Sequence, residues 1–151
     1  MKTRVLLVDD ERDFLDIMAE RIRARGMTVT TATSAEEAAK MVKMGSYDTV
    51  IMDFMMPALD GFKALKLMKI RQSEVQIFLL TGNLLDEQRM EAKALGALDM
   101  IEKPPDLKDL IEKIKKAKKV RRTVHRKKAG KKEAAQDAGE PLAARRTDPP
   151  L

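Results

Sequence analysis

The chain of 151 residues contains no cysteine and no tryptophan, and aromatic residues make up only 3% of it. Without cysteine there is no disulfide framework, no thiolate metal site and no cysteine nucleophile. No apolar run has the length of a membrane span, and the first residues reach Asp9 and Asp10 too early for a signal peptide. These absences favour a cytoplasmic protein.

Positive charge is concentrated in one short segment. The formal net charge is +6, but residues 115–132 hold 11 Lys+Arg and no Asp or Glu, whereas residues 1–114 hold 17 Lys+Arg against 20 Asp+Glu. Any nucleic-acid binding would therefore depend on this segment. Its one histidine, His125, we interpret as a solvated side chain. We predict one domain over residues 1–118 and a basic, disordered tail over residues 119–151, which is too polar to bury a core.

Within the first domain, apolar runs of strand length alternate with helical patterns. The predicted strands cover residues 4–8, 27–31, 49–53, 75–82 and 99–105. The predicted helices follow them, at residues 9–26, 34–45, 61–71, 84–96 and 107–119. Ser34 and Glu37 have the spacing of a capping box, and Asp106 precedes the last helix as an N-cap. This alternation predicts an α/β fold with a parallel sheet covered on both faces.

Polar residues stand where the predicted strands end. Asp9 and Asp10 follow the first strand, Asp53 ends the third, Thr81 lies near the end of the fourth, and Lys103 near the end of the fifth. A parallel sheet brings these positions to one edge. Three carboxylates there would repel one another, and Mg²⁺, which prefers oxygen ligands, would relieve that repulsion. With a hydroxyl and an ammonium beside them, the set indicates phosphoryl transfer.

Taken singly, each of these residues has an ordinary alternative. Asp9 and Asp10 could stabilise a helix N-terminus, Asp53 and Thr81 could be turn residues, and Lys103 could be a surface charge. Their joint occurrence at strand ends favours the functional interpretation.

The stretches VLLVDDE, VIMDFMMPALDGF, IFLLTGN and GALDMIEKPP resemble the receiver domains of bacterial two-component response regulators. The resemblance covers roughly residues 3–118. It implies a doubly wound, flavodoxin-like (βα)5 fold with a five-stranded parallel sheet in the order 2-1-3-4-5. It also implies phosphorelay signalling, in which a histidine kinase donates a phosphoryl group, with catalysis limited to the protein's own phosphorylation and dephosphorylation.

The resemblance assigns a role to each residue of the site. Asp53 matches the phosphoacceptor, Asp10 and Asp53 match carboxylate ligands of Mg²⁺, and Asp9 matches a ligand that acts through water. The backbone carbonyl of Met55 takes the place of the remaining protein ligand.

Two further residues complete the implied site. Thr81 matches the switch hydroxyl that moves toward the phosphoryl group, and Lys103 matches the residue that pairs with that group. The bond between Lys103 and Pro104 is commonly cis in such domains.

The sequence departs from the family pattern at several positions. Met100 stands where the family usually has an aromatic residue that acts as a rotameric switch coupled to Thr81. Met55 and Asn83 match positions that border the path of the hydrolytic water, and the apolar side chain of Met55 offers that water no hydrogen bond. We therefore expect Met55 to influence the lifetime of the phosphorylated state.

Residues 119–151 are too few for a winged helix, so the resemblance predicts a single-domain receiver that acts through a target or phosphotransfer protein. Homodimerisation through residues 84–96, 99–105 and 107–119 would also fit. The basic tail could bind nucleic acid or an anionic surface, or only aid solubility.

Two alternatives belong to other functional classes. One is an adaptor, independent of phosphorylation, whose basic tail binds nucleic acid. The other is a Mg²⁺-dependent phosphatase of the haloacid-dehalogenase type, which would carry its nucleophile in a D-x-D motif on the first strand, where this chain has VDDER.

Overall fold

The computed structural model describes residues 2–57 and 60–145, with side chains described up to residue 127. Its five strands are β1 (Arg4–Val8), β2 (Thr28–Ala32), β3 (Thr49–Asp53), β4 (Gln76–Thr81) and β5 (Asp99–Glu102). The helices are α1 (Arg12–Arg23), α2 (Ala35–Met44), α3 (Gly61–Arg71), α4 (Asp86–Ala94) and α5 (Leu107–Arg145). Strand and helix alternate along the chain, as the sequence predicts.

The five strands form one parallel sheet in the order β2-β1-β3-β4-β5. This confirms the predicted doubly wound topology. In the register of the sheet, Val8 of β1 lies beside Met52 of β3, and Asp53 lies beside Leu80 of β4. The residues that follow β1, β3, β4 and β5 therefore reach the same edge of the sheet.

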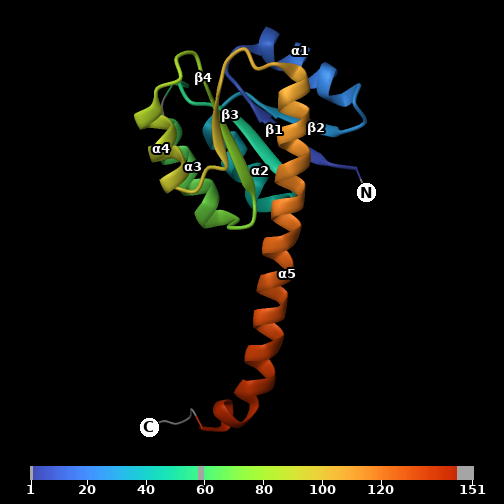
Figure 1. Ribbon diagram of the computed structural model, residues 1–151, viewed down its shortest axis with the longest axis vertical. Helices are drawn as coiled ribbons and strands as arrows, with labels where there is room; N and C mark the ends of the chain where they lie inside the picture. Colours follow the sequence, from blue (N-terminus) through green and yellow to red (C-terminus); the bar gives the residue numbers. More distant parts are fainter. Residues whose placement is uncertain (1, 58–59, 146–151) are drawn as a thin grey trace. The chain divides into compact units, whose positions relative to one another are not determined.

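The strands are nearly continuous apolar runs because both faces of the sheet are buried. Leu6 and Val8 point to the face covered by α2, α3 and α4, while Val5 and Leu7 point to the face covered by α1 and α5. Figure 1 shows the first part of α5, up to Arg121, in front of the sheet, and α2 and α3 behind the sheet. This two-sided core holds the carboxyl ends of the strands in fixed positions.

The helix caps predicted from the sequence are present in the structure. The Ser34 side chain accepts a hydrogen bond from the Glu37 backbone N–H at 3.1 Å, and Asp106 accepts one from the Asp109 N–H at 3.1 Å. Each bond satisfies a backbone donor that a helix N-terminus leaves unpaired. After α1 and α4, Gly26 and Gly96 adopt positive φ values of 85° and 108°, which glycine adopts at little steric cost.

The chain from residue 119 differs from the predicted disordered tail, because α5 continues to Arg145. The prediction was based on the lack of an apolar stripe, whereas helix propensity acts through the backbone. Alanine, lysine, arginine and glutamate are all good helix formers, and they dominate this segment. Residues 146–151 of the predicted tail lie outside the described part of the chain. The described chain divides into two compact units between Arg121 and Arg122.

Arg121, at the end of the first unit, is tied to the loop between α2 and β3. Its Nη1 donates to Oδ1 of Asp48 at 3.2 Å, and its Nη2 donates to Oγ of Ser46 at 3.0 Å. The other oxygen of Asp48 accepts the Arg4 backbone N–H at 2.8 Å. Asp48 is buried, so these partners keep its charge satisfied.

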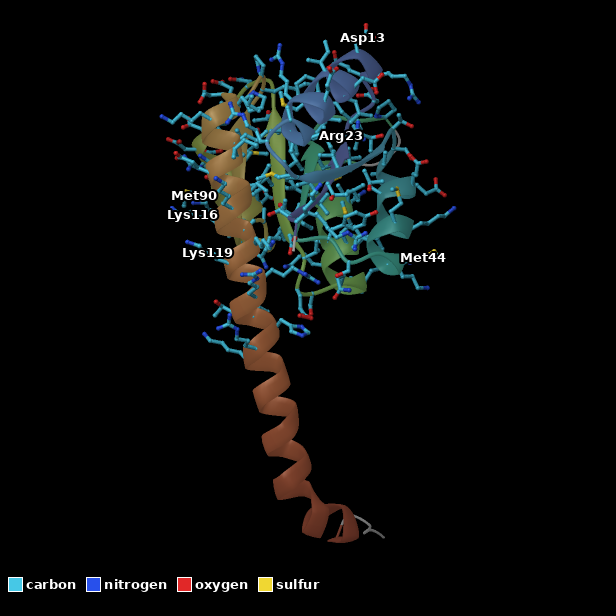
Figure 2. The ribbon with its side chains drawn as sticks, turned by 90° about the vertical axis from the view of Figure 1, so that its right-hand side faces the viewer. Asp13, Arg23, Met44, Met90, Lys116 and Lys119 are labelled. Carbon is cyan, nitrogen blue, oxygen red and sulfur yellow. The ribbon has the colours of Figure 1, made fainter. Side chains whose placement is uncertain are left out.

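The exposed surface carries several lysines and methionines. Lys116 and Lys119 project outward from α5, and Met44 and Met90 lie on the surface of α2 and α4 (Figure 2). Across the described residues, no helix has both the length and the apolar character needed to cross a membrane.

Candidate acidic site at the carboxyl edge of the sheet

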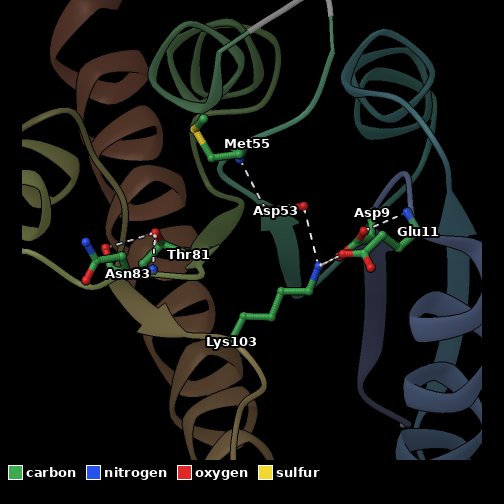
Figure 3. A network of polar contacts seen from close by, with 7 residues as sticks. All are labelled: Asp9, Glu11, Asp53, Met55, Thr81, Asn83 and Lys103. Carbon is green, nitrogen blue, oxygen red and sulfur yellow. Dashed lines mark hydrogen bonds and ion pairs between the residues drawn. The ribbon is translucent and has the colours of Figure 1, made fainter.

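Asp53 is the last residue of the fully buried strand β3 and is itself only 6% exposed. Its Oδ1 accepts a hydrogen bond from the Met55 backbone N–H at 3.2 Å, and its Oδ2 lies 3.5 Å from Nζ of Lys103 (Figure 3). The strand therefore delivers a carboxylate to the edge of the sheet, where one oxygen is held by the backbone and the other faces an ammonium.

Among the described residues, three aspartates meet at this edge. Asp9, Asp10 and Asp53 each offer an oxygen, and these oxygens all lie within 4.8 Å of one another. Asp9 is fully buried, and its Oδ1 accepts the Glu11 backbone N–H at 2.8 Å, whereas Asp10 is exposed. The structure thus brings together the three aspartates that the sequence predicts as metal ligands.

The donor set fits a hard divalent cation. Oδ2 of Asp9 is buried, and its partner among the described residues is Lys103 Nζ, which forms an ion pair with it at 2.9 Å. An oxygen of this kind has a free lone pair for a cation or a cation-bound water. Oxygen ligands from several carboxylates, with one side open to solvent, match the coordination that Mg²⁺ prefers.

The surroundings of Asp53 disfavour its charge. Burial raises the pKa of Asp53, and the nearby negative charges of Asp9 and Asp10 raise it further. The Met55 N–H and the ammonium of Lys103 lower it, but the net shift is upward from the ordinary value. A cation beside these carboxylates would reverse part of this shift, because opposite charge favours ionisation.

Lys103 follows β5 and points back across the site. Burial alone would lower its pKa, but contacts with Glu11 and Asp9 and the charge of Asp53 raise it well above the ordinary value. Its backbone N–H donates to the carbonyl of Thr81 at 2.7 Å, which fixes the start of the loop. The peptide bond between Lys103 and Pro104 is cis, as the family resemblance implies.

Thr81, the last residue of β4, is 4% exposed. Its hydroxyl donates to the Asn83 carbonyl and accepts the Asn83 N–H, each at 3.2 Å. In Figure 3 these bonds direct the hydroxyl toward Asn83 and away from Lys103. Met100, at the position of the usual switch aromatic, is 1% exposed and packs into the core covered by α2, α3 and α4.

The Met55 side chain is 72% exposed and lines the open cleft over Asp53. It also borders a neighbouring hollow with Leu85 and Asn83. Its side chain thus lies where the sequence predicts an influence on water access.

Two residues of the site were not predicted from the sequence. Glu11 forms an ion pair with Lys103, and the ring of Phe14 lies 4.5 Å from the Lys103 ammonium, measured to its centroid. Glu11 could have been suspected because it follows Asp9 and Asp10 at the same strand end. Phe14 gave no such signal, because an apolar residue within the predicted helix 9–26 is an ordinary candidate for the core.

Comparison with known proteins identifies the class to which this fold and site belong. Residues 5–115 match the sequence model of the response regulator receiver domain, and the chain belongs to that family. It is 36% identical over 109 residues to the response regulator SaeR of Staphylococcus epidermidis, covering 72% of this chain and 47% of that protein. For SaeR of Staphylococcus aureus the identity is 33% over 112 residues, covering 74% and 49%. The chain therefore spans about half the length of these curated relatives.

Solved structures agree with this assignment. A receiver domain from Clostridium thermocellum is 27% identical, with a TM-score of 0.76, and the match covers 81% of this chain and 98% of that one. The receiver domain of the Francisella response regulator 1452 is 25% identical with a TM-score of 0.73, and the match covers 78% and 98%. Asp53 accordingly lies on the third strand of a receiver fold, which does not fit the first-strand nucleophile of a haloacid-dehalogenase phosphatase.

Proposed function

We propose that this receiver domain accepts a phosphoryl group from a histidine kinase on Asp53, with Mg²⁺ bound beside it. The observation that carries the proposal is the cluster of Asp9, Asp10 and Asp53 within 4.8 Å, with the Lys103 ammonium 3.5 Å from Asp53. A carboxylate nucleophile, a cation site and a fixed ammonium are the parts that phosphoryl transfer requires.

Each side chain has a defined task in the transfer. An oxygen of Asp53 forms the new bond to phosphorus while the bond to the donor breaks, and the leaving group departs with that electron pair. Mg²⁺, held by Asp10 and Asp53, by Asp9 through water and by the Met55 carbonyl, would supply positive charge to the phosphoryl oxygens. Lys103 offsets the remaining charge on those oxygens.

Phosphorylation would then alter the Thr81 hydroxyl. In the unphosphorylated chain the Thr81 hydroxyl forms hydrogen bonds with the backbone of Asn83. A phosphoryl dianion on Asp53 would offer that hydroxyl a stronger, charged acceptor. We propose that Thr81 turns toward this group and that the change is transmitted through α4, β5 and α5 to a target or phosphotransfer protein. The protein would act in the cytoplasm and catalyse only its own phosphorylation and dephosphorylation.

The test uses acetyl phosphate as a small phosphoryl donor and follows intact protein mass. The wild-type chain should gain the mass of one phosphoryl group in the presence of Mg²⁺ and none in the presence of EDTA. Asp53→Asn should gain none in either condition. Absence of label on the wild type, or equal label on Asp53→Asn, would refute the proposal.

A further inference from the structure

Glu11 is a carboxylate at the site that the proposed transfer does not use. It is the N-cap residue of α1, and its side chain is 64% exposed. Its Oε1 accepts a hydrogen bond from Lys103 Nζ at 2.5 Å, across 92 positions of the sequence. The Glu11 backbone N–H is bonded to Asp9, so the loop fixes its position beside the buried aspartate.

Lys103 is surrounded by three carboxylates at unequal distances. Its Nζ lies 2.5 Å from Glu11, 2.9 Å from Asp9 and 3.5 Å from Asp53. The phosphoacceptor is therefore the most distant of the three. The Phe14 ring lies against the same ammonium and adds a cation–π contact from α1. Figure 3 shows the Lys103 ammonium between Asp53 on one side and the Asp9 and Glu11 carboxylates on the other.

We infer that Glu11 is a positioning residue for Lys103. Before phosphorylation Glu11 holds the Lys103 ammonium toward α1, and after phosphorylation the ammonium leaves Glu11 and binds the phosphoryl group. This inference rests on the proposed function. An exposed ion pair is weak, because water solvates both partners and salt screens them. A phosphoryl dianion on the buried Asp53 is a stronger acceptor, and the flexible lysine stem allows the ammonium to follow it.

Glu11 should consequently slow phosphoryl uptake. It competes with the incoming group for Lys103, and it adds a fourth negative charge to an edge that already holds Asp9, Asp10 and Asp53. The first effect depends on the contact with Lys103. The second is an effect of charge alone, and another acidic residue nearby would produce it as well.

The experiment compares Glu11→Gln with Asp13→Asn. Asp13 is an exposed acid in the first turn of the same helix, so its substitution removes the same charge close to the site. With acetyl phosphate and saturating Mg²⁺, Glu11→Gln should take up label roughly two- to five-fold faster than the wild type, the size expected for one exposed ion pair. Asp13→Asn should change the rate by clearly less. Thermal unfolding of each variant reports whether the fold is intact.

A double-substitution cycle distinguishes positioning from charge. In a Lys103→Met background the effect of Glu11→Gln should fall to that of Asp13→Asn, because the contact no longer exists. Added KCl should increase the labelling rate of the wild type more than that of Glu11→Gln, because salt screens the ion pair between Glu11 and Lys103. Equal rates for Glu11→Gln and Asp13→Asn, or an undiminished Glu11→Gln effect without Lys103, would overturn the inference. A wild-type chain that takes no label would instead refute the proposed function, and this inference with it.

Discussion

Nζ of Lys103 lies 3.5 Å from Oδ2 of Asp53 and joins the ends of two strands that are not neighbours in the sheet. Strand β4 runs between β3 and β5, and the backbone of Thr81 at its end holds Lys103 through a hydrogen bond of 2.7 Å. The relationship therefore depends on the order of the strands. It places the Lys103 ammonium where it can interact with a charge added to Asp53.

The charge of Asp53 should reduce the stability of the metal-free protein. Its pKa is raised, so the folded state binds the Asp53 proton more tightly than the unfolded state does. The stabilisation from that proton is present below the ordinary carboxyl pKa and is lost as pH rises through the folded-state pKa. At pH 7 without divalent ions, Asp53→Asn should therefore raise the unfolding temperature by a few degrees.

The advantage of Asp53→Asn should shrink as the pH is lowered, since the wild-type carboxyl then becomes neutral. Added Mg²⁺ should raise the unfolding temperature of the wild type more than that of the variant, because ligand binding stabilises the folded state. Asp13→Asn serves as the control for an exposed acid. An unfolding temperature of Asp53→Asn at or below that of the wild type would contradict this account of the acidic cluster.

Met55 should influence how long the phosphorylated state lasts. Its exposed thioether lines the cleft over Asp53 and offers no hydrogen bond to an attacking water. Met55→Asn and Met55→Glu introduce groups that could orient such a water, so each should change the rate of label loss from Asp53 by several-fold. Met44→Asn, on the exposed surface of α2, should leave that rate unchanged. Decay that is the same in both Met55 variants and the wild type would exclude this role.

The ion pair between Arg89 of α4 and Asp99 of β5 should appear in the pH dependence of stability. Burial alone would raise the Asp99 pKa, but hydrogen bonds from Arg89 and from the Met100 N–H outweigh it and lower that pKa. The ion pair therefore stabilises the folded state above the ordinary carboxyl pKa, near 4. This stabilisation is lost as the pH falls through the lower pKa that Asp99 has in the folded state.

Arg89→Met should accordingly lower the free energy of unfolding at pH 7, by less than about 1 kcal/mol because the arginine is partly exposed. The difference from the wild type should vanish at acidic pH. Arg71→Met, an exposed position at the end of α3, provides the comparison for loss of a surface cation. If Arg89→Met and the wild type still differ in free energy of unfolding at low pH, the ion pair between Arg89 and Asp99 is not the cause of the difference.

The contact between Arg121 and Asp48 should stabilise the first unit. Arg121→Ala leaves one oxygen of the buried Asp48 without its partner and should lower the free energy of unfolding by about 1–2 kcal/mol. Arg122→Ala, at the exposed neighbouring position, should have little effect. In chains that already carry Asp48→Asn, the cost of Arg121→Ala should fall, as measured by denaturant unfolding. Equal costs in both backgrounds would mean that the two side chains are not coupled.

The strands and the candidate site were predictable because each depends on local pattern. Buried parallel strands give continuous apolar runs, and the polar residue that ends each run is visible in the chain itself. The strand predictions agree with the structure within two residues except at the last one, where the strand ends at Glu102 and the predicted run continued to Pro105. Pro104 has no N–H to donate, so the ladder cannot extend far beyond that point.

The contacts that were missed are long-range. Glu11 meets Lys103 across 92 positions and Asp48 meets Arg121 across 73, and no local periodicity indicates such pairs. The length of α5 was missed for another reason. Apolar periodicity reports burial, and the basic segment forms helix without it.

The central claim is that Asp53 is the residue that carries the phosphoryl group. Its most direct test is tandem mass spectrometry of the chain after brief incubation with acetyl phosphate and Mg²⁺, with digestion under mildly acidic conditions that preserve an acyl phosphate. The account predicts the added phosphoryl group on the peptide that contains Asp53, and within it on Asp53 itself. A phosphoryl group on Asp9, Asp10 or a hydroxyl residue, with Asp53 unmodified, would contradict it.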